Sequence, residues 1–82
     1  MPTLLREHGF RFFFYMADRY EPPHVHVERD DNAVRIWLDP LEIAFVDGLR
    51  PHERKQMLRI TEQHLSEFIS AWHRKFGELS NE

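Results

Sequence analysis

The sequence predicts an α+β fold in which an antiparallel four-stranded meander sheet carries one long C-terminal helix packed on one face, in the order β-β-β-β-α. Two observations lead to this prediction. Between residues 10 and 47, short apolar segments alternate with turn-forming residues, as in a meander of strands. From Pro51 to Phe76, apolar residues recur at the spacing of a helix. Since 82 residues support one modest core, we expect residues 1–82 to form a single small domain.

The first two predicted strands cover residues 10–17 and 24–29. The first is the segment Phe-Arg-Phe-Phe-Phe-Tyr-Met-Ala, whose aromatic composition is typical of a strand. Pro22 and Pro23 separate the two strands, because proline has no amide hydrogen to donate to a sheet.

The third and fourth predicted strands cover residues 33–38 and 42–46. Turn-forming residues bound both of them: the turns are Asp30-Asp31-Asn32, Asp39-Pro40 and Asp47-Gly48. These short turns favour strands that follow one another as antiparallel neighbours.

The predicted helix covers residues 51–76. Proline is favoured at the first helical position and glycine just after the last, which fits Pro51 and Gly77. An apolar stripe follows one side of this helix and consists of Leu58, Leu65, Ile69, Trp72 and Phe76, widened by Thr61 and Phe68. We expect the stripe to pack on the sheet.

A turn closed by Asp30 and Ala33 sets the predicted register of the middle hairpin. It pairs apolar residues on one face of the sheet, Val27 with Ile36 and Val25 with Leu38. On the other face it pairs Glu28 with Arg35, His26 with Trp37 and His24 with Asp39. Because side chains alternate between the faces of a strand, the fourth strand adds Ile43 and Phe45 to the apolar face under the helix.

The face away from the helix is the predicted interaction face. It combines aromatic and cationic side chains of the first three strands: Arg11, Phe13, Tyr15, Arg35 and Trp37. Such a face is too apolar to stand alone in water. It is an interface with a protein partner or a second copy of the chain, a surface covered by residues 1–9, or a platform for a ligand. For so small a domain we favour protein association.

The pair His24 and His26 is a candidate metal site. Side chains at positions i and i+2 of a strand point the same way, so two imidazoles can converge on one ion. The predicted register adds Asp39 opposite His24, which gives two histidines and one carboxylate, a ligand set suited to a divalent metal such as zinc. The alternative is structural, with His24 bonded to Asp39 and His26 packed on Trp37, and no cofactor at all.

Composition excludes several function classes. The chain has no cysteine, which excludes disulfides, cysteine-based zinc sites and a thiolate nucleophile. Its 11 Lys and Arg residues are outnumbered by 14 Asp and Glu residues, and this net charge of −3 disfavours nucleic-acid binding. No apolar run is long enough to cross a membrane and no secretory signal is recognisable, so we expect a cytoplasmic protein.

Several motifs together suggest a family. They are Met1-Pro2-Thr3, Gly9 before an aromatic strand, Pro22-Pro23-His24-Val25-His26-Val27, Gly48-Leu49 with Pro51, and His64 with Trp72 in the helix. This pattern resembles a family of small bacterial proteins known as domain of unknown function 4160. The departures are the Arg29-Asp30-Asp31 turn, Ile60-Thr61 where a tryptophan is usual, and a short C-terminal tail.

The resemblance implies no established activity. Members of this family are often encoded beside another small reading frame, which implies one partner of a toxin–antitoxin-like pair. We therefore expect a small interaction or regulatory module. The alternative is a metal-binding protein or metal-dependent enzyme centred on His24 and His26, and the sequence leaves open whether the protein is an enzyme.

Overall fold

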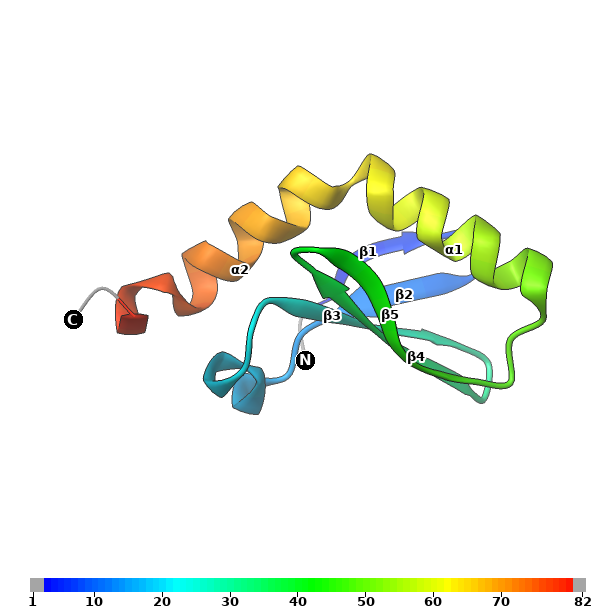
Figure 1. Cartoon of the computed structure of the whole chain (residues 1–82), viewed down its shortest axis with the longest axis horizontal. Helices are drawn as coiled ribbons and strands as arrows, with labels where there is room; N and C mark the ends of the chain where they lie inside the picture. The colour runs from blue at the N-terminus through cyan, green and yellow to red at the C-terminus, as the bar shows by residue number, and fades with distance from the viewer. Residues whose placement is uncertain (1–2, 81–82) are drawn as a thin grey trace.

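The computed structural model describes residues 3–80, which form a five-stranded antiparallel sheet covered by two helices (Figure 1). Met1 and Pro2, which belong to the family pattern, lie outside the described residues. The strands follow the chain in the order β1-β2-β3-β4-β5: Thr3–Glu7, Phe10–Phe13, His24–Arg29, Asn32–Leu38 and Leu41–Asp47. A 3₁₀ helix, η1, covers Met16–Tyr20, and the α-helices are α1, Pro51–Gln63, and α2, Leu65–Ser80.

The α+β class, the antiparallel meander and the C-terminal helical layer are confirmed, but the numbers of strands and helices were wrong. The additional strand is β1, which pairs with β2 through a two-residue turn at His8 and Gly9. Both turn residues have positive φ, 52° and 84°, as tight hairpin turns require. Residues 3–7 therefore extend the sheet at its edge and do not fold over the predicted interaction face.

The single long helix was also wrong, because the helix breaks at His64. There φ is −110° and ψ is 17°, and the His64 amide donates to the carbonyls of both Ile60 and Thr61. One turn earlier, the buried Thr61 hydroxyl donates to the Met57 carbonyl at 2.8 Å, a side-chain bond of the kind that bends helices. The break lets α1 and α2 follow the twisted sheet as an arch (Figure 1).

The predicted register of the middle hairpin was wrong by two residues. Asp30 adopts a positive φ of 55°, so the turn is the two-residue Asp30-Asp31, closed by the pair Arg29–Asn32. As a result His24 lies opposite Trp37 and His26 opposite Arg35. A shift of two residues preserves the alternation of side chains, so Val25, Val27, Val34 and Ile36 still face the helices.

The fourth strand departs from the predicted alternation at one residue. Arg35 pairs with Phe45 but Ile36 pairs with Ile43, so Ala44 is an extra residue in β5, a β-bulge. Beyond the bulge the side chains change face. Phe45, predicted under the helix, is exposed on the opposite face of the sheet beside Arg35.

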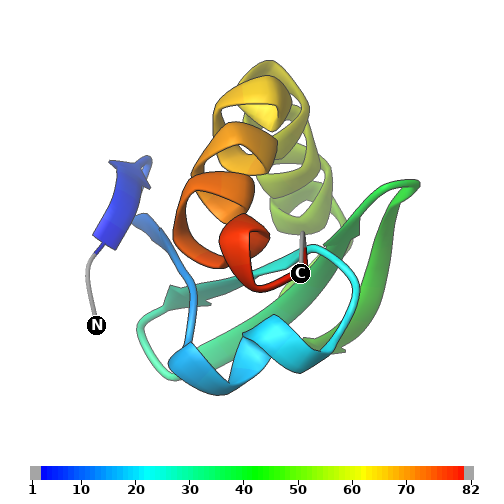
Figure 2. The same cartoon turned by 90° about the vertical axis from the view of Figure 1, so that its left-hand side faces the viewer.

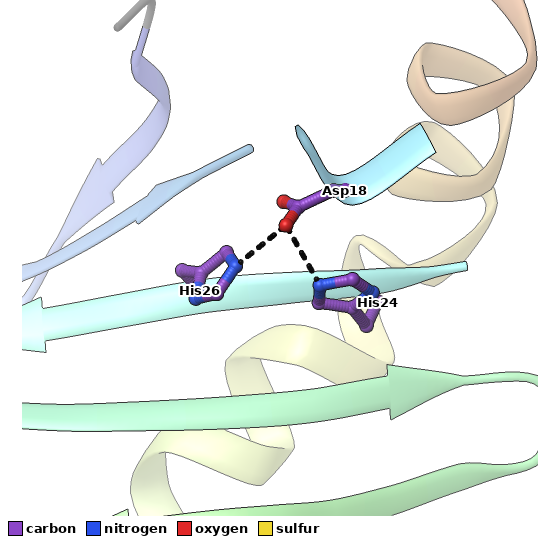
Figure 3. A group of neighbouring side chains, drawn as sticks. All are labelled: Asp18, His24 and His26. Carbon is purple, nitrogen blue, oxygen red and sulfur yellow. Dashed lines mark hydrogen bonds and ion pairs between the residues drawn. The ribbon is translucent and has the colours of Figure 1, made fainter. Parts of the chain in front are cut away.

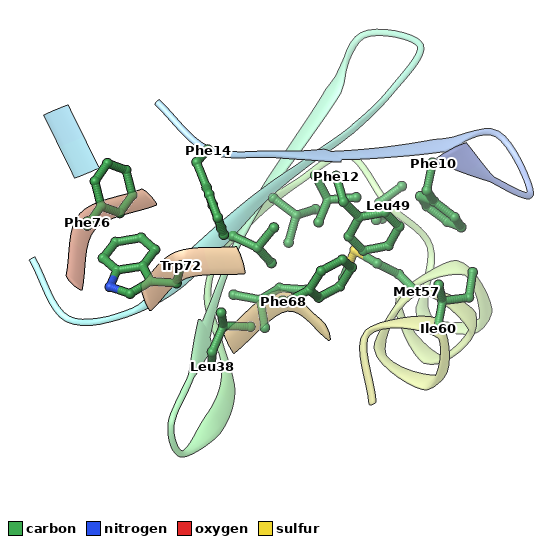
Figure 4. Packing of buried hydrophobic residues seen from close by; sticks show 14 residues of the cluster. Phe10, Phe12, Phe14, Leu38, Leu49, Met57, Ile60, Phe68, Trp72 and Phe76 are labelled. Atoms are coloured by element: carbon green, nitrogen blue, oxygen red, sulfur yellow. The ribbon is translucent and has the colours of Figure 1, made fainter. Parts of the chain in front are cut away.

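The core between sheet and helices is largely aromatic (Figure 4). Phe12 stacks on Phe68 with ring centroids 5.3 Å apart, and the Phe14 ring meets Trp72 edge-on at 5.2 Å. Among the helical residues whose burial is described, the buried ones are Met57, Ile60, Thr61, Phe68, Trp72 and Phe76. Leu58, Leu65 and Ile69, expected at the centre of the stripe, are half-buried, because the break at His64 rotates the two helical faces relative to one another.

At the end of the sheet where β3 begins, η1 lies on the side away from α1 (Figure 2). Within residues 3–80 no helix is both long and apolar enough to span a membrane.

The break at His64 generates a prediction about pH. The His64 side chain bonds the Glu67 carboxylate through Nδ1, and its Nε2 lies 3.3 Å from Glu7 Oε1 on β1. The bond to Glu67 is the largest cause of a raised His64 pKa, and Glu7 adds to it. Because the folded pKa lies above the unfolded value, this stabilisation is complete below about pH 6.5 and is lost as the pH rises through the folded pKa.

We expect the urea midpoint of the wild-type protein to fall between pH 6 and pH 8.5, and we expect His64→Gln to remove most of this fall. His73→Gln, which changes an exposed histidine of α2, is the matched control and should keep the wild-type pH dependence. An unchanged pH dependence in His64→Gln would show that the contacts of His64 with Glu7 and Glu67 do not stabilise the fold.

Candidate metal centre

Three side chains that could bind a metal ion meet where η1 crosses the start of β3 (Figure 3). Asp18 Oδ1 lies 3.1 Å from Nε2 of His24 and 3.1 Å from Nε2 of His26. The three ligand atoms all lie within 4.8 Å of one another, and among residues 3–80 this is the one group of three or more His, Asp or Glu side chains with such spacing.

The local sequence explains why Asp18 is held here. The Asp18 amide donates to the Tyr15 carbonyl at 3.1 Å, and the Tyr15 amide donates to Asp18 Oδ2 at 2.8 Å. These reciprocal bonds fix the first turn of η1 and engage one carboxylate oxygen with the backbone. The other oxygen, Oδ1, is left facing the two histidines.

The strand orients both imidazoles towards the same oxygen. His24 and His26 are two residues apart on β3 and share a face. Pro22 supplies the carbonyl that lies 2.9 Å from His24 Nδ1, and the Pro23 carbonyl accepts a bond of 3.0 Å from the Leu38 amide, so β3 begins at a fixed point on β4. The two prolines thus connect the histidine pair to the sheet.

The contact with Pro22 fixes the proton of His24. A carbonyl oxygen can only accept a hydrogen bond, so Nδ1 must be the protonated nitrogen and neutral His24 presents a lone pair at Nε2. This Nε2 is buried and makes no hydrogen bond within residues 3–80, although Asp18 Oδ1 lies 3.1 Å away. For neutral His24, this arrangement places two electron-pair donors face to face in the interior.

Burial divides the site into a closed side and an open side. The side chains of His24, Asp18 and His26 are 0%, 9% and 20% exposed. The rings of Trp37 and Trp72 lie 5.3 and 5.4 Å from that of His24 and close the inner side. His26 stands at the open side.

The neighbours of His26 are also aromatic. Its ring stacks on Phe13 at 5.6 Å and meets the half-exposed Tyr15 edge-on at 4.6 Å. These contacts restrict the orientation of the imidazole, as the residues around metal ligands commonly do.

Two of the three separations among these atoms are close to those between the ligands of one metal ion. Ligand atoms about 2.0–2.1 Å from a tetrahedral zinc ion lie roughly 3.3 Å from one another, and both measured nitrogen–oxygen separations are 3.1 Å. The hydrogen bond from His24 Nδ1 to a backbone carbonyl is the arrangement that directs the opposite nitrogen of a histidine to a metal. Two imidazoles and one carboxylate suit zinc or iron(II) and leave at least one coordination position open.

The structure brings together two of the three predicted ligands. The cross-strand pairing that placed Asp39 opposite His24 is wrong, since Trp37 lies there, and Asp18 supplies the carboxylate. Sequence reasoning missed Asp18 because it belongs to a connection between strands, where no strand or helix periodicity relates it to the histidines. Asp18 stands four residues before Pro22, and this position alone does not indicate a ligand.

The residues of the predicted interaction face lie on the same side of the sheet as the metal centre. Arg11 forms an ion pair of 2.8 Å with Glu28 and covers the Phe13 ring at 4.3 Å. Arg35 was predicted opposite Glu28, but its guanidinium lies 3.4 Å from Glu21 and 5.9 Å from the Trp37 ring. In the connection from residue 14 to residue 23, η1 lies over one end of this face, while β1, Thr3–Glu7, forms the edge of the sheet (Figure 2).

The fold and the site define a small α+β domain that carries a candidate metal centre on the sheet face opposite the helices. The family model described as Domain of unknown function (DUF4160) matches residues 9–73. The chain belongs to this family, as its sequence motifs indicated. Asp18, His24 and His26 all lie within the matched residues. Neither the curated proteins nor the solved structures gave a match.

We expect the metal-free protein at pH 7.5 to contain His24 as the neutral tautomer with the proton on Nδ1, because the Pro22 carbonyl requires a donor there. Long-range ¹H–¹⁵N correlation spectra of the imidazoles measure this directly, and His26→Gln identifies the signals of His24 by elimination. A proton on Nε2 at this pH would contradict the lone pair that the site requires.

Proposed function

We propose that the protein binds one divalent transition metal ion, zinc in the first place, through Asp18, His24 and His26. The observation that carries the proposal is the buried Nε2 of His24, which has a lone pair, no hydrogen bond within the described residues, and a carboxylate oxygen at 3.1 Å. Asp18 Oδ1 already forms a hydrogen bond with His26 Nε2 at 3.1 Å, so His24 Nε2 is the atom that a cation would satisfy.

The competing explanation is a buried ion pair in which His24 is doubly protonated. A buried ion pair stabilises a fold only when its geometry is good and its remaining donors are bonded. The Nε2 of His24 does not meet hydrogen-bond geometry with Asp18 Oδ1, so a proton on this nitrogen would form no hydrogen bond with the carboxylate. A hydrogen bond needs a nearly linear arrangement of donor, proton and acceptor, but a metal ion does not. Its ligand atoms surround it, at the corners of a tetrahedron in the case of zinc.

The number of ligands indicates the kind of site. Structural zinc sites are closed by four protein ligands, whereas catalytic sites have three and keep one position for water or substrate. Asp18, His24 and His26 provide three protein ligands, and the site opens to solvent at His26. A metal-dependent reaction is therefore the activity that this centre would support.

We expect isothermal titration at pH 7.5 to show one zinc ion per chain, and zinc to raise the melting temperature because it binds only the folded state. Affinity should fall as the pH drops below about 6, since both imidazoles must be neutral to bind the ion. Asp18→Asn and His26→Ala should each weaken binding at least tenfold, with folding verified by circular dichroism.

His73→Ala is the matched control, since it removes an exposed histidine from α2 and should bind zinc like the wild-type protein. Zinc binding that is lost equally in the control, or that survives in both Asp18→Asn and His26→Ala, would contradict the proposed centre.

We also propose, as a second candidate function, that the face around the centre binds a protein partner or a second copy of the chain. The supporting observation is a group of large apolar side chains exposed on and beside η1, namely Tyr15, Met16 and Tyr20, the last 78% exposed, with Phe45 exposed on β5. Exposed apolar residues gathered in this way mark association surfaces. A role in a toxin–antitoxin-like pair would use such a surface.

We expect sedimentation equilibrium of the wild-type protein to show reversible self-association at micromolar to millimolar concentration, weakened in the double variant Tyr20→Ser/Phe45→Ser. Leu58→Ser, on the helical side, is the control and should associate like the wild type. A monomeric mass throughout this range would exclude the second copy and leave a different protein as the partner.

A further inference from the structure

We propose that Glu21 is an exchangeable fourth ligand of the metal centre, which closes the site when bound and opens it when it pairs with Arg35. This inference rests on the proposed metal centre and names the group that regulates it. Its starting point is a distance: Glu21 Oε1 lies 3.8 Å from Nε2 of His24, the atom on which the centre depends.

The backbone of Glu21 is held by a hydrogen bond, whereas its carboxylate is exposed and pairs with Arg35 at 3.4 Å. Glu21 caps the C-terminus of η1, where its amide donates to the Asp18 carbonyl at 3.0 Å. Its side chain is 48% exposed and lies outside the tight group of three ligands. A rotation of the side chain is therefore sufficient to move the carboxylate towards the ion, without displacement of β3 or η1.

The side chain of Glu21 is 48% exposed, so its carboxylate can approach the centre from solvent. Trp37 and Trp72 enclose His24 from within, so a fourth ligand must approach from solvent. The fourth corner of a zinc tetrahedron lies roughly 3.3 Å from each of the other three ligand atoms. With Glu21 Oε1 at 3.8 Å from His24 Nε2, the carboxylate needs to approach by only a small amount on that side.

Arg35 competes with the metal for the same oxygen. Its Nη1 lies 3.4 Å from Glu21 Oε1, and both side chains are well exposed. Exposed ion pairs of this kind contribute little, because water solvates both charges and salt screens them. A divalent ion held by three fixed ligands attracts the carboxylate more strongly, so we expect metal binding to draw Glu21 away from Arg35.

The exchange gives the centre two states. With Glu21 bound, two nitrogens and two carboxylate oxygens surround the ion in a closed set. With Glu21 on Arg35, one position is open to water or to an incoming ligand. Arg35 thus sets the balance between the two states, since it stabilises the open one.

Cobalt(II) tests this inference because its visible absorption reports coordination number, and it occupies sites of zinc geometry. We expect the wild-type protein to give the intense visible bands of four-coordinate cobalt. Glu21→Gln should weaken binding at least tenfold and change the positions and intensities of the visible bands, because water replaces a carboxylate oxygen as the fourth ligand. Arg35→Gln should have the opposite effect and tighten binding severalfold, because the competing cation is removed.

Glu28→Gln is the matched control, since Glu28 is a carboxylate on the same face that pairs with Arg11 and not with the centre. It should leave affinity and spectrum unchanged. If the wild-type protein binds no cobalt, the proposed metal centre is contradicted. If the wild type binds and Glu21→Gln matches it in both affinity and spectrum, the centre stands and the role of Glu21 is overturned.

Discussion

The buried imidazole of His24 is the group on which the functional end of this molecule depends. It stands at the first position of β3, in contact with Trp37 of the sheet and Trp72 of α2, and it faces Asp18 of η1. A histidine in this position must have a use for both nitrogens, because a buried polar atom without a partner is costly. One nitrogen is bonded to the Pro22 carbonyl. The other nitrogen, Nε2, faces the carboxylate of Asp18 on η1.

The features of the fold that follow from the alternation of side chains between the two faces of a strand were predictable. A two-residue slip of the middle hairpin changed every cross-strand partner yet kept every side chain on its face, because alternation has a period of two. The features that sequence reasoning missed are local: the left-handed turn at His8-Gly9, the bulge at Ala44, and the Thr61 bond beside the helix break. Each involves only one or two residues, for which periodicity carries no signal.

The candidate site shows the same division between regular and irregular structure. His24 and His26 were predictable as a pair because the strand fixes their common direction. The register that placed Asp39 opposite His24 was wrong, and the carboxylate beside the two histidines is that of Asp18, in a 3₁₀ turn between strands. The site therefore joins a regular element to an irregular connection. That connection also carries Glu21 and exposed aromatic side chains, so the candidate metal centre and the proposed association surface share one segment.

X-ray absorption at the zinc edge of the zinc-loaded protein tests the central claim most directly, because it reports the atoms bound to the ion. The account predicts a first shell of nitrogen and oxygen at about 2.0–2.1 Å, with the multiple-scattering signature of two imidazole rings that falls to one ring in His26→Ala. An ion surrounded by oxygen alone, without imidazole scattering, would contradict it. His24 would then be a structural residue, and the face around it would have another use.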